Sequence, residues 1–216
     1  AHYDYWSDTV RRSILMDSKA DLLVFGMGER GILEIARRLA AGGTARGLRD
    51  LRGVAYRLGA SETERLTETL AQTPVEPAPA GAAAGGSNVP DGTARGFATL
   101  AVPPFEEVAR DPQAFCRMTR IAHQETNPYN ARQLVQRHGA ECVVVNPPAL
   151  PLTREEMDRV YGLPYTRRPH PAYGRRKIPA WEVIRNSVQI MRGCFGGCTF
   201  CSITAHEGRV VQSRSE

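Results

Sequence analysis

The sequence predicts an α/β fold, because short apolar runs with the length of buried strands alternate with segments of helical periodicity. A Pro-, Ala- and Gly-rich stretch at 73–96 interrupts this alternation and has almost nothing to bury, which predicts a flexible linker or insertion. We therefore expect an α/β arrangement on each side of the linker. The apolar runs lie at 21–25, 52–59, 97–102 and 141–145.

Helices are expected between these runs. Apolar residues recur at helical spacing in "GILEIARRLAAGG", which ends on two glycines, and "SETERLTETLAQ" at 61–72 begins with a Ser-x-x-Glu capping pattern. After the linker we expect helices around 105–125 and at 130–138, and a short helix that begins near Thr153. A Pro-rich segment then leads into the apolar run "VQIM" at 188–191, which we expect to be a strand.

The bulk composition argues for a cytoplasmic protein with reduced thiols. The apolar runs are far too short to cross a bilayer, and the N-terminal "AHYDYWSDTVRR" lacks the apolar core of a secretory signal. The five cysteines, an odd number, argue against a disulfide framework. The net charge of +5 comes from scattered basic residues, which we interpret as solvated faces. This charge is compatible with a nucleic-acid partner but does not indicate one, and no membrane partner is expected.

A glycine pattern after the first apolar run leaves two interpretations open. "GMGERG" places Gly26, Gly28 and Gly31 in a G-x-G-x-x-G pattern between an expected strand and an expected helix, which is the context of a dinucleotide-binding fingerprint. However, Glu29 inside the loop would repel a pyrophosphate, and Asp50 precedes the next expected strand instead of ending it. A glycine turn that joins a strand to a helix is the simpler interpretation.

Three of the five cysteines, Cys194, Cys198 and Cys201, lie within eight residues in a C-x3-C-x2-C spacing. A structural zinc site would need a fourth ligand, for which His206 is at a suitable spacing. A redox pair would use Cys198 and Cys201 and leave Cys194 without a role. A [4Fe–4S] cluster would use all three thiolates and leave one iron open to bind a substrate. Unrelated buried cysteines would not explain such dense clustering.

Glycines surround these cysteines, at positions 193, 196 and 197. A chain that wraps around a cubane needs unusual backbone angles and close approach, and glycine permits both. The glycines therefore fit the cluster interpretation.

The cysteine spacing, with Phe200 directly before the third cysteine and an apolar run before the loop, resembles the signature of the radical S-adenosylmethionine (SAM) enzymes. The wider run "NSVQIMRGCFGGCTFCSITAHEGRVVQSRSE" resembles the YgiQ-type branch of that family. The same is true of "AHYDYWSDTVRRSILMDSKADLLVFGMGERGILEIARRLA", "HQETNP", "VNPPALPLTREEMD" and "LPYTRRPHPAYGRRKIPAWEVIR". The resemblance covers most of the chain apart from 73–96.

The resemblance implies that Cys194, Cys198 and Cys201 bind a [4Fe–4S] cluster whose fourth iron is chelated by SAM. One electron from a flavodoxin- or ferredoxin-type donor would cleave SAM to methionine and a 5′-deoxyadenosyl radical, which abstracts hydrogen from a substrate that the sequence does not identify. Phe200 would lie near the SAM adenine. The alternative is a non-catalytic module with a structural zinc at the three cysteines and His206.

The resemblance also implies a fold. Residues 1–72 would end an N-terminal Rossmann-like domain of cobalamin-binding type, 73–97 would be the linker, 98–180 an α/β connecting region and 181–216 the start of a partial (β/α) barrel. No D-x-H-x-x-G motif is visible, so cobalamin binding is not implied. We expect the strand at 188–191 to pair beyond residue 216, and the chain to be a truncated fragment that is inactive alone.

The remaining polar and cysteine residues carry weaker expectations. His206–Glu207 would have a structural role at the start of a barrel helix. His123 and Glu125, near a helix end, would have capping and surface roles. Cys116 and Cys142 would be buried small apolar side chains.

Overall fold

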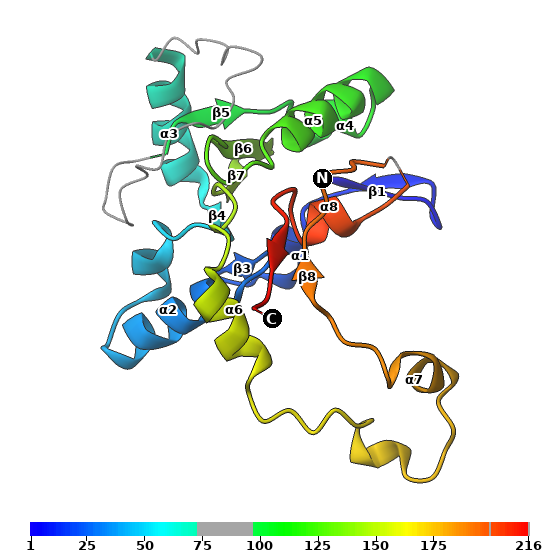
Figure 1. The fold of residues 1–216 in the computed structure, drawn as a ribbon. Helices are drawn as coiled ribbons and strands as arrows, with labels where there is room; N and C mark the ends of the chain where they lie inside the picture. The colour runs from blue at the N-terminus through cyan, green and yellow to red at the C-terminus, as the bar shows by residue number, and fades with distance from the viewer. Residues whose placement is uncertain (73–96, 199, 216) are drawn as a thin grey trace.

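The structure is a computed structural model that describes residues 1–72, 97–198 and 200–215. A five-stranded sheet in the order β3-β4-β7-β6-β5 forms its centre (Figure 1). Two separate two-stranded sheets, β1-β2 and β8-β9, complete the described strands. The strands are β1 His2–Asp4, β2 Thr9–Arg11, β3 Leu23–Val24, β4 Val54–Leu58, β5 Thr99–Ala101, β6 Gln133–His138, β7 Glu141–Val145, β8 Met191–Arg192 and β9 Gln212–Ser213.

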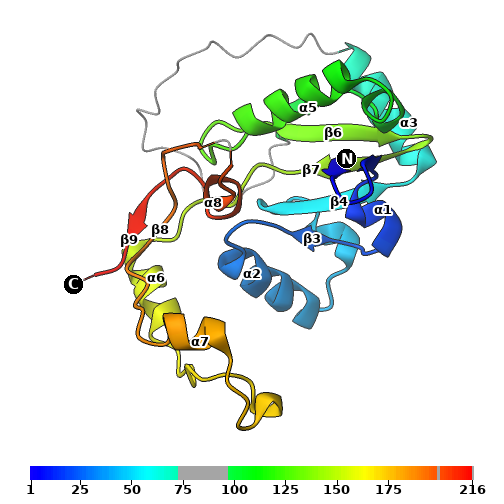
Figure 2. The same cartoon turned by 90° about the vertical axis from the view of Figure 1, so that its right-hand side faces the viewer.

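Helices cover the central sheet on both faces, so the fold is layered (Figure 2). Among the described residues, none of these helices combines the length and the apolar character that crossing a membrane requires. They are α1 Ile14–Ser18, α2 Glu29–Ala40, α3 Ala60–Gln72, α4 Phe105–Val108, α5 Pro112–Gln124, α6 Arg154–Tyr161, α7 Pro179–Ile184 and α8 Ile203–His206, with short 3-10 helices η1 Ala45–Leu48 and η2 Pro171–Tyr173.

The central strands β4 and β7 are buried on both faces, which explains why they appear in the sequence as continuous apolar runs. Val54 and Val144 belong to a core cluster against which Ile35 of α2 and Leu66 of α3 pack. On the opposite face, Ala55 packs with α1. Cys142 lies in the first core and is fully buried, as expected. Cys116 is exposed on α5, so the expectation that it is buried was wrong.

The pairing of the sheet is mixed. β5 and β6 are parallel and are connected through α4 and α5, whereas the other neighbouring pairs in this sheet are antiparallel. Because β3 and β4 are antiparallel neighbours, β3–α2–β4 is not the parallel crossover unit of a Rossmann-like fold. The α/β class is confirmed, while the Rossmann-like description is not confirmed. The sheet combines strands from both sides of the predicted linker. Residues 73–96 of that linker lie outside the described residues.

The helix expected at 130–138 was wrong, because this segment forms strand β6. β6 has hydrogen-bonded neighbours on both edges, β5 and β7, and a tight turn at Gly139, whose φ is +64°, returns the chain into β7. Pairing on both edges satisfies the backbone groups of β6 and overrides the helical propensity of its Gln, Leu and Arg residues. By contrast, the short helix expected near Thr153 is confirmed as α6, which begins with a capping box of Thr153 and Glu156.

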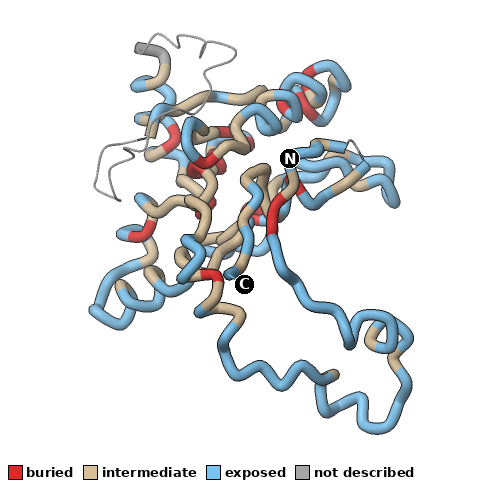
Figure 3. Tube along the Cα trace, viewed as in Figure 1, coloured by how far each residue is buried: buried red, intermediate tan, exposed pale blue. Residues whose placement is uncertain are grey.

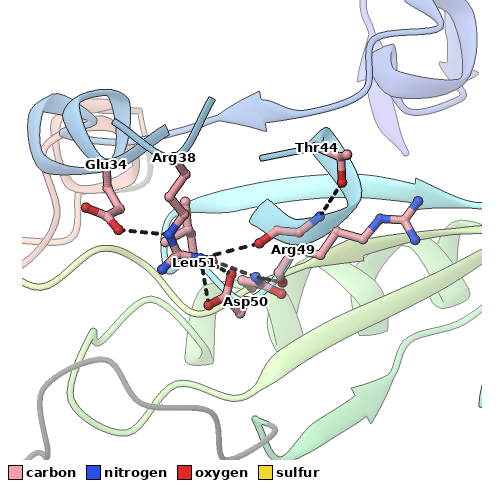
Figure 4. Close-up of polar contacts among 8 residues, drawn as sticks. Glu34, Arg38, Thr44, Arg49, Asp50 and Leu51 are labelled. Atoms are coloured by element: carbon pink, nitrogen blue, oxygen red, sulfur yellow. Dashed lines mark hydrogen bonds and ion pairs between the residues drawn. The ribbon is translucent and has the colours of Figure 1, made fainter. Parts of the chain in front are cut away.

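The C-terminal end of α2 is held to the following segment by Arg38 (Figure 4). Its Nε donates to Glu34 Oε1 at 2.8 Å, and its Nη1 donates to both carboxylate oxygens of Asp50 at 2.8 and 3.0 Å. These hydrogen bonds, first to Glu34 and then to Asp50, raise the pKa of Arg38. Asp50, the acid considered above with the glycine pattern, therefore joins α2 to the segment that follows η1.

The chain between α6 and β8 leaves the body of the molecule as an extended arm that carries η2 and α7 (Figures 1 and 2). Most of this arm is exposed (Figure 3). The strand expected at 188–191 shortens to Met191–Arg192, and Val188 and Ile190 are exposed. β8 pairs antiparallel with β9. The described chain therefore supplies a partner for one edge of β8 by returning after the cysteine loop, while the expected pairing with a strand beyond residue 216 stays a prediction.

We expect the stability of the fold to fall in mild acid because of His138. Its side chain is buried and stacks on Phe105 with ring centroids 5.3 Å apart, and neither ring nitrogen has a hydrogen-bond partner among the described residues. Burial lowers the pKa of His138 to about 4. The unfolded chain takes up this proton near pH 6.5, so stability is lost as the pH falls from about 6.5 towards 4, by about 2 kcal/mol.

Urea unfolding at pH 7 and pH 4.5 measures this loss. His138→Phe should reduce the loss between the two pH values, whereas His2→Phe, a change at an exposed histidine, should leave it as in the parent chain. An unchanged pH dependence in His138→Phe would show that another buried group causes the acid instability.

Candidate functional site

The cysteine loop leaves the body of the protein directly after β8, and two hydrogen bonds close its base. The backbone N–H of Cys194 donates to Gly208 O at 3.1 Å, and that of Gly193 donates to Glu207 Oε2 at 2.9 Å. α8 lies inside this closed loop. Residues 193–208 thus form a loop whose two ends are fixed to each other, with the three cysteines between them.

Glycine is required at the entrance of the loop. Gly193 has φ +80°, and a Cβ at this position would lie 2.2 Å from the carbonyl oxygen of Val210. Gly197 also has a positive φ, of +66°. The sequence argument that glycines let the backbone curl around the cysteines therefore has a structural counterpart at positions 193 and 197.

Two of the three thiols border the same space. The N–H of Gly196 donates to Cys194 Sγ at 3.4 Å, and a Cβ on Gly196 would lie 3.4 Å from Cys194 Sγ and 3.8 Å from Cys198 Sγ. The absent side chain of Gly196 thus leaves room between the two sulfurs. A turn in which Cys201 N donates to Cys198 O at 3.1 Å places the third cysteine next along the loop. All three are free thiols.

The donor set suits an iron–sulfur cluster, since thiolates are the ligands that such clusters use. Within the described residues, however, no three His, Cys, Asp or Glu side chains converge on one point where a metal ion could be held. Cys194 and Cys198 both border Gly196, and neither Cys201 nor His206 joins them in a group of three. The residues therefore fit the cluster in the chemistry of their sulfur ligands.

Aromatic side chains of the loop point into solvent. Phe200 has an exposed fraction of 91%, and Phe195 is similarly exposed. Large exposed aromatic groups beside a candidate site are available to contact a ligand, and no described residue covers them.

Arg192, the last residue of β8, anchors the loop to the body of the protein. It is 91% buried, and its Nη1 donates to Glu29 Oε1 at 2.5 Å. Its Nε donates to the hydroxyl of Tyr161 at 2.9 Å, and its guanidinium lies over the Tyr161 ring, 5.0 Å from the centroid. Arg192 therefore joins the cysteine loop to both α2 and α6.

The glycine pattern at residue 26 has a structural role. Gly26 has φ +68°, Gly28 precedes the first residue of α2, and Gly31 lies inside that helix. A Cβ on Gly26 would lie 3.7 Å from the carbonyl oxygen of His206, so α8 approaches this turn closely. Glu29 binds Arg192, as described above. These contacts favour the simple glycine turn, which supports the cysteine loop, over a dinucleotide site.

A cavity of about 280 Å³ lies between this turn, the end of β7 and the segment after α8. Glu125 and Arg132 form an ion pair in its wall, in which Arg132 Nε donates to Glu125 Oε1 at 2.9 Å. Glu125 is the C-cap residue of α5, which confirms its expected capping role, but its side chain is only 7% exposed, so the expected surface role was wrong. His123 bonds through Nε2 to Arg209 of the cysteine-loop segment instead of capping its helix.

We expect Arg192→Met to destabilise the protein by about 2–3 kcal/mol, because removal of one partner of a largely buried ion pair leaves the other charge unpaired. Glu29 Oε1 accepts from Arg192, and Glu29 Oε2 has no hydrogen-bond partner among the described residues. The substitution would therefore remove the charged partner of this carboxylate. Urea unfolding measures the loss, and the double variant Arg192→Met/Glu29→Gln should recover part of it. Arg37→Met on the exposed face of α2 is the control, with a change within about 0.5 kcal/mol. Equal losses for the two arginines would exclude an anchoring role.

Sequence comparison places the chain among known proteins. A model of the family described as "Radical SAM N-terminal" matches residues 1–187. A UPF0313 protein of Rhodopseudomonas palustris is 54% identical over 216 residues, which are the whole of this chain and 30% of that protein. The UPF0313 protein YgiQ of Escherichia coli is 49% identical over 239 residues, again with the whole of this chain and 32% of the relative. No solved structure matches.

The chain spans about a third of the length of the curated relatives it matches. The family model ends at residue 187, before the cysteine loop. The relatives match the whole chain, so the region of similarity to them includes the loop. The resemblance to YgiQ-type proteins is therefore confirmed, and the chain belongs to the radical SAM N-terminal family.

Proposed function

We propose that this chain carries the cluster-binding loop of a radical SAM enzyme, with Cys194, Cys198 and Cys201 as ligands of a [4Fe–4S] cluster. The observation that carries the proposal is the position of the Cys194 and Cys198 sulfurs beside Gly196, in a loop closed at its base. Three thiolates leave one iron of a cubane without a protein ligand, and that iron is the site for SAM. When bound and reduced by an external one-electron donor, the cluster would supply the electron that cleaves SAM to methionine and a 5′-deoxyadenosyl radical.

The protein residues hold the loop in place. Arg192 and Glu207 fix its base, and the glycines give the backbone its curvature. The thiols are accessible, since Cys198 is exposed and the other two are partly exposed, so cluster assembly needs no unfolding. We propose that Cys201 is the third ligand of the set. Phe200, exposed beside Cys201, is proposed to contact the SAM adenine.

The exposure of the loop also supports a protein electron donor of the flavodoxin or ferredoxin type, because such donors must approach the cluster closely. We propose a cytoplasmic location, where thiols remain reduced. We further propose that the chain is part of a longer protein such as the relatives, and that residues 181–216 begin the catalytic domain of that protein. The substrate belongs to that longer protein, and SAM turnover is proposed for the whole protein only.

Anaerobic reconstitution with iron and sulfide tests the proposal. About four iron atoms and four sulfides per chain, with the brown colour and visible absorption of a cubane, are expected. SAM added to the dithionite-reduced protein should change the electron paramagnetic resonance spectrum if one iron is open. A colourless protein that takes up one zinc per chain would refute the cluster and support the structural zinc site at the three cysteines and His206.

A further inference from the structure

Arg209 places a positive charge directly on the cysteine loop. Its Nη2 lies 3.1 Å, and its Cζ 3.7 Å, from the position that a Cβ on Gly197 would occupy. Gly197 is thus covered by the guanidinium, and it has no side chain that would push the guanidinium away. Gly196, with the Cys194 and Cys198 sulfurs beside it, is one peptide unit from Gly197, about 3.8 Å between Cα atoms. The charge and both sulfurs therefore flank the same short stretch of backbone.

No carboxylate of the described residues forms an ion pair with Arg209. None of the ion pairs between described residues includes Arg209, and the nearest acid in the sequence, Glu207, accepts from the N–H of Gly193. The Nη2 of Arg209 is instead held by the Nε2 of His123 on α5, a residue 86 positions away in the sequence. An uncharged imidazole can accept this hydrogen bond and orient the guanidinium without cancelling its charge.

A cation in this position favours the reduced state of a bound cluster. One-electron reduction adds one negative charge to the cluster, and a nearby fixed positive charge stabilises that added charge. Charge and hydrogen bonds near the sulfurs are known determinants of the reduction potentials of iron–sulfur clusters. The loop has both, in the Arg209 guanidinium and in the Gly196 N–H that donates to Cys194 Sγ.

We infer that Arg209, oriented by His123, is a positioning residue that raises the reduction potential of the cluster and so makes it easier for a low-potential one-electron donor to reduce. The inference rests on the proposed function, since it requires a cluster at the three cysteines. It adds to the candidate site a positively charged residue from the segment after α8, oriented by His123 of α5.

The test is a redox titration of the reconstituted protein with dithionite, followed by electron paramagnetic resonance of the reduced cluster. In Arg209→Gln, the ratio of reduced to oxidised cluster at a fixed potential should fall about tenfold, which for a one-electron couple is a shift of 59 mV to lower potential. Arg209→Lys keeps the charge and should recover most of the shift. Arg37→Gln, at an exposed arginine on α2, is the matched control and should titrate as the parent chain does.

The outcomes separate the inference from the proposed function. A parent chain that forms no cluster refutes the proposed function. A parent chain with a cluster whose potential is the same in Arg209→Gln refutes only the inference. If Arg209→Gln binds too little cluster for titration, His123→Ala is titrated instead, because it keeps Arg209 but removes the partner that orients its guanidinium. A shift to lower potential in His123→Ala supports the inference, and an unchanged potential overturns it.

Discussion

Cys198→Ala should abolish iron binding by the reconstituted protein, whereas His206→Ala should leave the iron content nearly unchanged. Cys198 is exposed, so loss of its sulfur removes a ligand without opening a cavity in the core. A cubane held by three protein thiolates cannot lose one of them and remain bound. His206 lies at the end of α8, and its side chain is exposed. Its removal should therefore affect neither the cluster nor the fold.

Parallel anaerobic reconstitutions of the variants, with iron and sulfide measured per chain, test this prediction. Cys116→Ala is the matched control, because it removes an equally exposed free thiol by the same substitution on α5, outside the loop. It should bind as much iron as the parent chain. Equal losses in Cys198→Ala and His206→Ala would identify the histidine as a ligand and refute the three-cysteine assignment.

The parts of the fold that were predictable are those whose signal is local. The apolar runs of β4 and β7 are continuous because both faces of these strands are buried, and the start of α6 follows from Thr153 and Glu156, three residues apart. β6 was not predictable in this way. Its strand conformation depends on β5 and β7, which satisfy its backbone on both edges, and neither partner is visible in the local sequence.

The candidate site shows the same division. Three cysteines and their glycines stand out within one short segment, so their spacing suffices to identify them. The groups that hold the loop come from distant parts of the chain: Glu29 lies 163 residues before Arg192, and His123 lies 86 residues before Arg209. In the sequence, Glu29 argued against pyrophosphate binding at the glycine turn. Its role as the partner of Arg192 becomes visible only in the fold, where β8 lies beside the start of α2. Single-sequence spacing carries no signal for such pairs.

Gly193→Ala should have the second large effect, because it introduces two costs at the base of the cysteine loop. The residue has φ +80°, a conformation that costs an L-residue about 1–2 kcal/mol. In addition, the new Cβ would lie 2.2 Å from the carbonyl oxygen and 2.9 Å from the carbonyl carbon of Val210, which is backbone and cannot rotate away. The two strands of the base must separate, and the hydrogen bonds of Gly193 to Glu207 and of Cys194 to Gly208 are lost with them.

The chain supplies a matched control for this change at the other end of the same loop. Gly208 has φ +87°, but a Cβ there would have no neighbour within 4 Å, so Gly208→Ala has the conformational cost without the clash. We expect Gly193→Ala to lose most of its iron on reconstitution and to unfold in urea at least 2 kcal/mol more easily than Gly208→Ala, the excess being the cost of backbone overlap and of the broken base. The difference in unfolding free energy between the two variants thus measures the effect of the close approach between residue 193 and the backbone of Val210. Similar iron content and similar unfolding free energies in both would mean that β8 and the segment after α8 are not held together at Gly193, and the closed loop proposed to hold the cluster would lose its base.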